Sequence, residues 1–141
     1  MEKDKKVFCY PDILFNEILP QKLQLSIMMD YAKRNNKVID FYTGENHKSF
    51  KQMNLFVKKF KTKPKINGYI FFSFFQFCYS EKVHIDLIKN ILNDGYNLYF
   101  VRENFKIETI ANFNSLKKDL FYFPETNKKT LNLLKENILF T

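Results

Sequence analysis

The chain has 141 residues, of which 45% are hydrophobic and 18% aromatic, with 17 phenylalanines and no tryptophan. This hydrophobic content excludes a disordered chain, and the length predicts one domain over residues 1–141. No apolar run approaches the roughly 20 residues that a membrane-spanning helix needs. No apolar signal segment follows the charged residues 1–6, so we expect a cytoplasmic protein that does not insert into a membrane.

The formal net charge is +8, and lysine is dense only over residues 58–65. A basic chain can favour nucleic acid, anionic lipid or acidic small molecules such as nucleotide sugars. The other basic residues are spread over several predicted helices. That spread favours a solvated surface, and nucleic acid is therefore the less favoured partner.

Cysteine, histidine and glycine form no recognisable site motif. Cys9 and Cys78 are predicted to be free thiols in a reducing compartment, and the cysteines and histidines stand at no metal-ligand spacing. Gly44, Gly68 and Gly95 form no phosphate-binding loop. We therefore expect neither a metal nor a cofactor.

Residues 6–60 predict strands and helices in alternation. Short apolar runs at 6–10 and 38–42 are typical of buried strands. The apolar loop at 11–19 is expected to pack over a neighbour or to help form an interface. A helix begins at Pro20, and another follows Thr43-Gly44. The buried positions expected on these two helices are Leu23, Ile27, Met28 and Tyr31, then Phe50, Met53, Val57 and Phe60.

Residues 66–104 predict a strand, a crossover helix and a second strand. The run 66–73 is apolar on both faces, Ser80 is placed to cap the helix, and Gly95 supplies the left-handed residue that ends it. The second strand, 96–101, is expected to be parallel to the first, as in a right-handed βαβ unit. The buried side of the helix is expected to carry His84, Leu87, Ile88, Ile91 and Leu92.

The remaining chain predicts a short strand or extended segment at 105–110, a helix over 112–121, and a last helix capped by Thr126. Together the elements predict an α/β fold, a three-layer sandwich around a mostly parallel sheet of about four strands in the order 2-1-3-4. That arrangement is flavodoxin-like. The core is expected over about residues 6–108, with a helical extension over about 109–141.

Polar residues at the carboxyl ends of the strands are expected to line a ligand-binding crevice above strands one and three. Glu45 and Glu103 are candidates for paired acid and base catalysis; the alternative is that each caps a helix or meets a lysine. Arg102 could bind a phosphate or carboxylate, or form a local ion pair. The expected ligand-binding residues are Tyr10, Gln24, Ser73, Gln76 and Arg102, with Asp12 and Thr43 beside them.

The aromatic segment 74–79 is unusual for the end of a strand. Its rings could stack on a sugar or a base, or they could pack internally or seal a dimer. We favour packing or a dimer contact.

The order of these features is similar to the catalytic domain of serine recombinases, the resolvases and invertases. This resemblance implies a resolvase-like fold over residues 6–104. Its chemistry is not matched, because Pro11-Asp12 stands where that family has its serine. The matching pieces are Tyr10, Gln21 with Gln24, Thr43-Gly44, residues 70–73, and Glu103-Asn104.

A second resemblance covers residues 20–108. The residues that carry it are Pro20-Gln21, Gln24, Tyr31, Glu45, Met53, and the runs 67–70, 73–76 and 97–103. In these residues the chain resembles the sporadic carbohydrate cluster proteins of bacterial surface-polysaccharide gene clusters, although Pro11 and Asp12 stand where that family has an arginine soon after the first tyrosine. The resemblance implies a setting in lipopolysaccharide or capsule biosynthesis, without a defined reaction.

We therefore expect a homodimeric protein of surface-carbohydrate biosynthesis that acts on or binds a sugar or nucleotide-sugar intermediate. Whether it is an enzyme stays open at this point. One alternative is a non-catalytic interaction subunit of a polysaccharide-pathway enzyme. The other is a degenerate resolvase-fold nucleic-acid binder.

Overall fold

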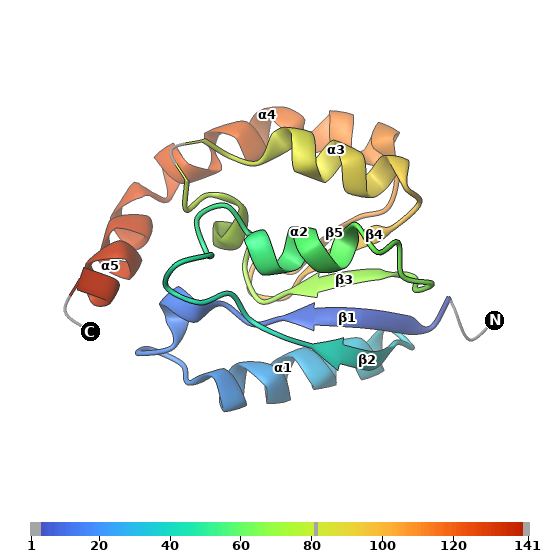
Figure 1. The fold of residues 1–141 in the computed structure, drawn as a ribbon. Coiled ribbons are helices and arrows are strands. Elements are labelled where there is room, and N and C mark those ends of the chain that lie inside the picture. The colour runs from blue at the N-terminus through green and yellow to red at the C-terminus, as the bar shows by residue number, and fades with distance from the viewer. Residues whose placement is uncertain (1–3, 81, 140–141) are drawn as a thin grey trace.

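A five-stranded sheet forms the middle layer of the molecule, in the order β2-β1-β3-β4-β5 (Figure 1). The computed structural model describes residues 4–80 and 82–139. Four strands are parallel, and the fifth runs antiparallel at one edge. The predicted order is confirmed, and the segment after Asn104 supplies the added edge strand. The strands are β1 (Lys6–Tyr10), β2 (Val38–Tyr42), β3 (Gly68–Phe71), β4 (Asn97–Phe100) and β5 (Phe105–Ile107).

The predicted βαβ unit forms the centre of this sheet. Strands β3 and β4 pair in parallel, with Tyr69 opposite Leu98, and every residue of β3 is buried. Gly68 begins β3 directly against the backbone of Asn97, where an added Cβ would collide with the Asn97 carbonyl group. The two strands approach so closely at this point that only glycine fits.

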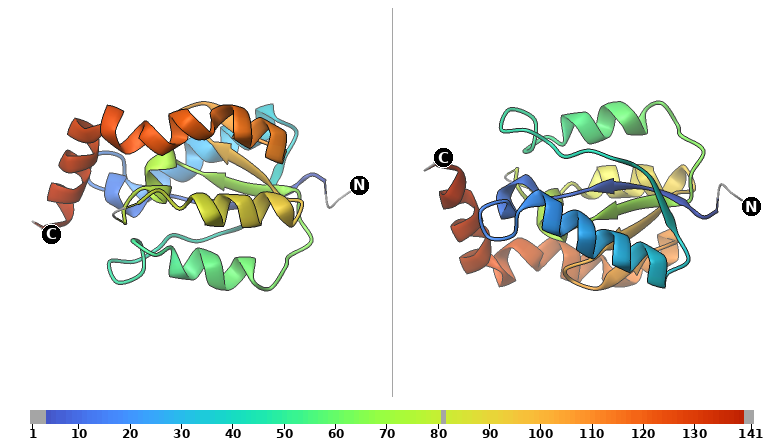
Figure 2. Two further views of the ribbon diagram at one scale, coloured as in Figure 1. Left: turned by 90° about the horizontal axis from the view of Figure 1, so that it is seen from above. Right: turned by 90° about the horizontal axis from the view of Figure 1, so that it is seen from below.

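Helices cover both faces of the sheet, which gives the three layers that the sequence predicts. One face carries α2, α3 and α4 side by side, and the other carries α1 (Figure 2). The short turn η1 and helix α5 pack together near the carboxyl ends of the strands (Figure 1). The helices are α1 (Gln21–Arg34), α2 (Asn54–Phe60), α3 (Ile85–Asn93), α4 (Ile110–Thr126) and α5 (Lys128–Leu139), with 3-10 turns η1 (Ile13–Phe15) and η2 (Phe74–Phe77).

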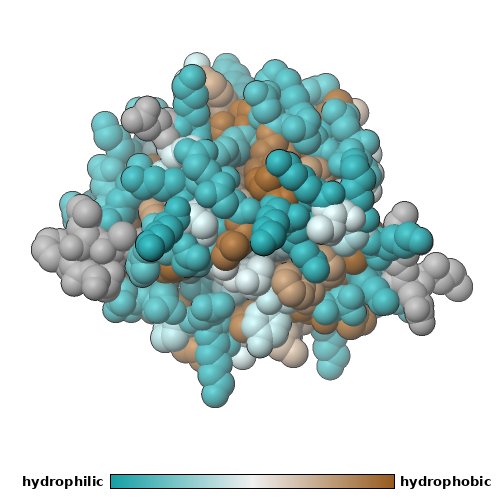
Figure 3. All heavy atoms as spheres, in the orientation of Figure 1, coloured by the Kyte–Doolittle hydropathy of each residue, from teal (hydrophilic) through white to brown (hydrophobic). Residues whose placement is uncertain are grey.

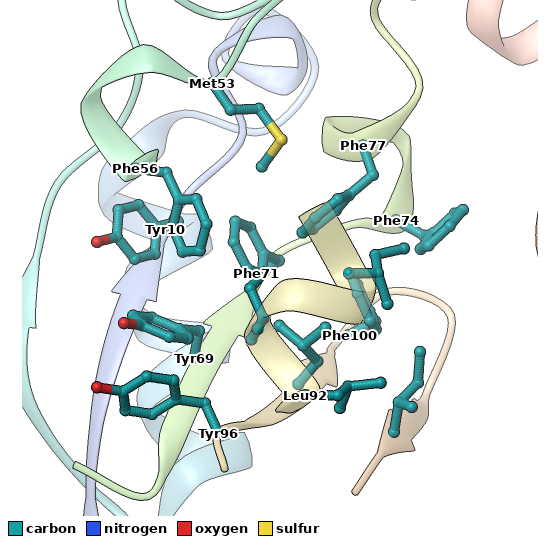
Figure 4. Close-up of a cluster of buried hydrophobic side chains, with 14 of the residues drawn as sticks. Tyr10, Met53, Phe56, Tyr69, Phe71, Phe74, Phe77, Leu92, Tyr96 and Phe100 are labelled. Carbon is teal, nitrogen blue, oxygen red and sulfur yellow. The ribbon is translucent and has the colours of Figure 1, made fainter. Parts of the chain in front are cut away.

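Aromatic rings fill the layer between the sheet and α2, α3 and α4 (Figure 4). Phe56 of α2 meets Tyr69 edge-on at 5.0 Å between ring centroids, and Phe71 meets Phe77 in the same way at 4.8 Å. Edge-to-face pairs of this kind stabilise a core by more than their buried area alone. The many phenylalanines of the sequence therefore serve mainly to build this layer.

The aromatic segment 74–79 packs internally. Phe74 and Phe77 enter the layer below α2 and α3, whereas Phe75 and Tyr79 face the layer that contains α1, η1 and α5. All of these side chains are buried. The packing interpretation of this segment is thus confirmed.

Several local predictions are wrong. Leu23 and Ile27 of α1 are 51% and 42% exposed, whereas Met28 and Tyr31 are buried as predicted and Gln24 takes the remaining inward position. Ser80 does not cap α3, which begins at Ile85. Thr126 ends α4 and caps no helix, since its hydroxyl donates back to carbonyl groups of the same helix.

The outer surface is mainly hydrophilic on the face shown in Figure 3, with small apolar areas between the charged side chains. Apolar side chains are nevertheless exposed on α1 and β2, among them Met29, Val38 and Tyr42. Within the described residues, every helix is too short or too polar to cross a bilayer.

Candidate functional site

Ser73, Gln76 and Glu103 form one hydrogen-bonded network at the carboxyl ends of β1, β3 and β4. The Ser73 hydroxyl donates to Glu103 at 2.6 Å, and the backbone N–H of Phe74 donates to the other oxygen of that carboxylate at 2.7 Å. Gln76 accepts from the N–H of Ser73 and donates to the carbonyl of Tyr10 at 3.0 Å. These bonds fix the turn η2 to the ends of three strands.

Arg102 lies beside this network. Its guanidinium carbon is 5.3 Å from the ring centroids of both Phe15 and Phe75, and its Nη1 is 3.3 Å from Oε2 of Glu103. The local ion pair considered from the sequence is thus present. The guanidinium thus lies within cation–π distance of both rings.

Glu45 caps helix α2. Its two carboxylate oxygens accept hydrogen bonds from the backbone N–H groups of Leu55 and Phe56, at 2.9 and 2.7 Å. The N-cap position itself is occupied by Met53, which offers no side-chain acceptor. Glu45 therefore satisfies donors that the start of the helix would otherwise leave open.

Gln24 is completely buried, and it ties α1 to the loop before it. Its oxygen accepts from the N–H of Asp12 at 2.7 Å, and its nitrogen donates to the carbonyl groups of Asp12 and Leu19 at 2.9 Å each.

The ring of Tyr10 lies in the aromatic layer between the sheet and α2, next to Tyr69 (Figure 4). The Tyr10 hydroxyl is buried without a hydrogen-bond partner among the described residues, and burial raises its pKa.

The structure thus brings Ser73, Gln76, Arg102 and Glu103 together in one network. Tyr10 and Glu45 line a small cavity together with Gln76, and Gln24 lies apart, bonded to the loop before α1. Glu45 and Glu103 both accept hydrogen bonds at the start of helical segments, as the capping alternative proposed. The catalytic and ligand-binding roles considered for these residues stay predictions.

Asp12 is the buried acid at the end of β1, only 2% exposed. The hydroxyl of Tyr79 donates to its Oδ2 at 2.7 Å, and the N–H of Leu14 donates to its Oδ1 at 2.9 Å. Burial raises the pKa of Asp12 to about 7, although these two hydrogen bonds act in the opposite direction. Asp12 is therefore an acid that changes charge near neutral pH.

A basin of about 810 Å³ opens next to this acid. It lies between the turns before α2, the loop that leads into α3 with the first turn of that helix, and Lys135 of α5. Its walls combine aromatic and aliphatic side chains with lysines, and His84 stands at its rim. The described lining residues are Phe50, Lys51, Gln52, Tyr79, Ser80, Lys82, Val83, His84, Ile85, Asp86, Leu87 and Lys135.

His84 was expected on the buried side of α3, and this prediction is wrong. It occupies the N-cap position, where its Nε2 lies 2.9 Å from the carbonyl oxygen of Lys51 and 3.3 Å from the hydroxyl of Ser80. Because a carbonyl oxygen only accepts, Nε2 carries a proton in this arrangement. His84 thus joins two walls of the basin.

A second, much smaller cavity of about 10 Å³ lies behind the basin. Phe50 and Tyr79 line both spaces and meet edge to face, with 5.8 Å between their ring centroids. Asp12 and Glu45 line the inner cavity. The two rings therefore form a partition between the basin and two carboxyl groups.

Sequence reasoning missed the basin, because its lining comes from three segments that are distant along the chain. Asp12 and Tyr79 stood in segments that were considered, but only the folded chain shows that they are hydrogen-bonded to each other. Within the described residues, no group of three or more histidine, cysteine, aspartate or glutamate side chains is arranged to hold a metal ion.

Comparison with known proteins agrees with the fold. No family model and no curated protein matches the chain. The structure is similar to the crystal structure of a resolvase family site-specific recombinase from Streptococcus pneumoniae, with a TM-score of 0.65 and 16% sequence identity. The match covers 96% of this chain and 95% of that chain. The chain has a resolvase-like α/β fold, and at this identity the likeness extends to the fold alone.

Proposed function

We propose that this protein binds a sugar or nucleotide-sugar intermediate of bacterial surface-carbohydrate biosynthesis in the basin beside Tyr79. The observation that carries the proposal is the basin itself, an open space of about 810 Å³ at the carboxyl edge of a mostly parallel sheet. Ligands of open α/β folds bind at this edge, and the volume lies within the range of about 300–1,000 Å³ of small-molecule sites.

The resemblance to sporadic carbohydrate cluster proteins supports the biosynthetic setting. Several residues that carry it, including Glu45, Ser73 and Glu103, hold the loops and helix starts at the carboxyl edge. Glu45 also lines the inner cavity behind the basin. In this proposal these residues shape the binding site, and the lining of the basin contacts the ligand. A cytoplasmic location and a homodimer belong to the same proposal.

A ligand screen tests this function directly. Thermal-shift measurements and saturation-transfer NMR with a panel of nucleotide sugars and free sugars should identify at least one ligand that stabilises the protein. Disruption of the gene should reduce surface glycan in the parent bacterium. If no compound of the panel gives a thermal shift or a saturation-transfer signal, and the disruption leaves the surface glycan unchanged, the proposal is refuted.

A non-catalytic interaction subunit is the second candidate, and the exposed apolar side chains of α1 favour it. Leu23, Ile27 and Met29 are 51%, 42% and 60% exposed on this helix. Exposed apolar groups of this kind often mark contacts with another protein. Co-purification of a pathway enzyme with the wild-type protein, lost in the Leu23→Lys plus Ile27→Lys double variant, would support this role. Purification of the wild-type protein without a partner, together with normal surface glycan in the double variant, would exclude it.

The likeness in fold to a recombinase makes nucleic acid a partner to test. Arg34 is paired with Asp30 at 3.0 Å, and Arg102 is paired with Glu103. The arginines of the chain are thus engaged in local ion pairs, which weakens the case for phosphodiester binding. We expect no shift of duplex DNA at about 50 mM salt, where electrostatic binding is strong.

A further inference from the structure

Three lysines from three separate segments line the basin. Lys51 comes from the turns before α2, Lys82 from the loop before α3, and Lys135 from α5. All three are exposed. The ion pairs found among the described residues involve other side chains, and Asp86 is the carboxylate among the described lining residues. Among the described lining residues, three lysines thus stand against one carboxylate, so this part of the lining is positively charged.

The lysine-dense segment 58–65 contributes nothing to this charge. Lys63 is paired with Asp94 at 3.1 Å, and Nζ of Lys59 lies 4.6 Å from the ring centroid of Phe41. Neither residue is among those that line the basin. The sequence therefore places its densest positive charge in one region, while the fold gathers scattered lysines around a concave space.

We propose that these lysines bind the phosphate groups of the ligand, so that the basin takes a sugar phosphate or a nucleoside diphosphate sugar and rejects a neutral saccharide. This inference rests on the proposed function and narrows its ligand class. Ammonium groups are compact point charges that bind phosphate well, and a concave, partly apolar site strengthens the attraction. The three ammonium groups come from separate segments that all line this one space.

The remaining walls suit the rest of such a ligand. Val83 and Leu87 offer partly buried aliphatic surface, and Phe50 and Tyr79 form the back wall. Apolar walls of this kind pack against the flat faces of sugars and bases. Gln52 is exposed and can reach hydroxyl groups by its amide. The basin thus offers ammonium groups for the phosphates and an apolar wall for the sugar or base.

Isothermal titration calorimetry on the full chain tests the inference with three probes: inorganic pyrophosphate, uridine diphosphate and neutral N-acetylglucosamine. We expect pyrophosphate and uridine diphosphate to bind, more weakly as salt is raised, and the neutral sugar not to bind. Lys51→Gln plus Lys82→Gln should weaken phosphate binding about tenfold or more. Lys117→Gln plus Lys118→Gln, on the exposed side of α4, is the matched control and should leave binding unchanged.

Three results would overturn the inference: no binding of either phosphate probe at low salt, equal binding of the neutral sugar, or equal weakening by both lysine pairs. Circular dichroism melting of each variant shows whether the fold is intact. Failure of the inference differs from failure of the proposed function. Neutral sugar binding with a glycan defect in the gene disruption would keep the function and remove the inference. Phosphate binding together with normal surface glycan in the gene disruption would support phosphate binding by the lysines and remove the proposed biosynthetic function.

Discussion

The hydroxyl of Tyr79 donates a 2.7 Å hydrogen bond to the buried carboxyl group of Asp12, and the ring of Tyr79 lines the basin. This bond links the proposed ligand site to an acid whose pKa is raised to about 7. Burial is the main cause of that shift. A change in the protonation of Asp12 therefore acts directly on Tyr79, a residue of the basin wall.

The stability of the protein should decrease as pH rises from about 4 to about 7. The folded carboxyl of Asp12, with a pKa of about 7, keeps its proton over this interval, whereas the unfolded one, near 3.8, has lost it. Asp12 therefore stabilises the folded state fully below about pH 4 and progressively less up to about pH 7. Above about pH 7 this contribution is absent, and stability no longer changes with the charge of Asp12. Urea denaturation should show a loss of about 4 kcal/mol from this group alone.

Asp12→Asn should remove this part of the pH dependence, because the amide does not titrate. Asp119→Asn on the exposed side of α4 is the control and should keep the wild-type slope. If Asp12→Asn and the wild type lose stability in parallel between about pH 4 and 7, the shifted pKa of Asp12 is contradicted.

Glu45→Ala should lower the free energy of unfolding by about 2 kcal/mol, because two backbone N–H groups at the start of α2 lose their acceptor. Chemical denaturation measures the change. The exposed Glu17 provides the matched control, and Glu17→Ala should change stability by less than about 0.5 kcal/mol. Equal effects of the two substitutions would show that the cap contributes nothing.

Ser73 and Glu103 should be energetically coupled, since their side chains share a 2.6 Å hydrogen bond in a largely buried place. A double-mutant cycle with Ser73→Ala and Glu103→Gln should give a coupling energy of about 1–3 kcal/mol. The exposed pair of Lys106 and Glu108 should give less than about 0.5 kcal/mol. Additive effects at Ser73 and Glu103 would contradict the network.

Gly68→Ala should destabilise the protein by about 3 kcal/mol, because the new methyl group collides with the backbone of Asn97 in the neighbouring strand. Gly95→Ala is the comparison. Gly95 has a φ of +89° and open space around its Cα, so alanine there should cost only about 1 kcal/mol of backbone strain. If the order of these two effects were reversed, the close contact between β3 and β4 would be wrong.

The sheet was predictable from the sequence because its strands are short and strongly apolar. Residues 68–71 are buried on both faces, and a short apolar run between turn residues is typical of a strand that is covered on both sides. The capping role of Glu45 was also among the alternatives. The sequence placed its helix directly after Gly44, however, whereas α2 begins at Asn54 and Glu45 reaches it across the turns between them.

The basin was not predictable, because it depends on where separate segments meet. The helical spacing of His84 with Ile88 and Ile91 suggested that it lies on the helix, yet α3 begins only at Ile85. Leu23 and Ile27 follow the same spacing as Met28 and Tyr31, and periodicity could not tell that α1 buries Gln24 against the loop before it. A buried glutamine that bonds three backbone groups is a tertiary feature that no local pattern reveals.

The central claim is that a phosphorylated sugar compound occupies the basin, and backbone amide NMR tests it most directly. Titration with uridine diphosphate N-acetylglucosamine should shift the amide signals of Lys51, Lys82 and His84, which line the basin, and leave those of Leu23 and Ile27 on the exposed side of α1 in place. Absence of shifts at the basin residues, or shifts confined to α1, would contradict the account.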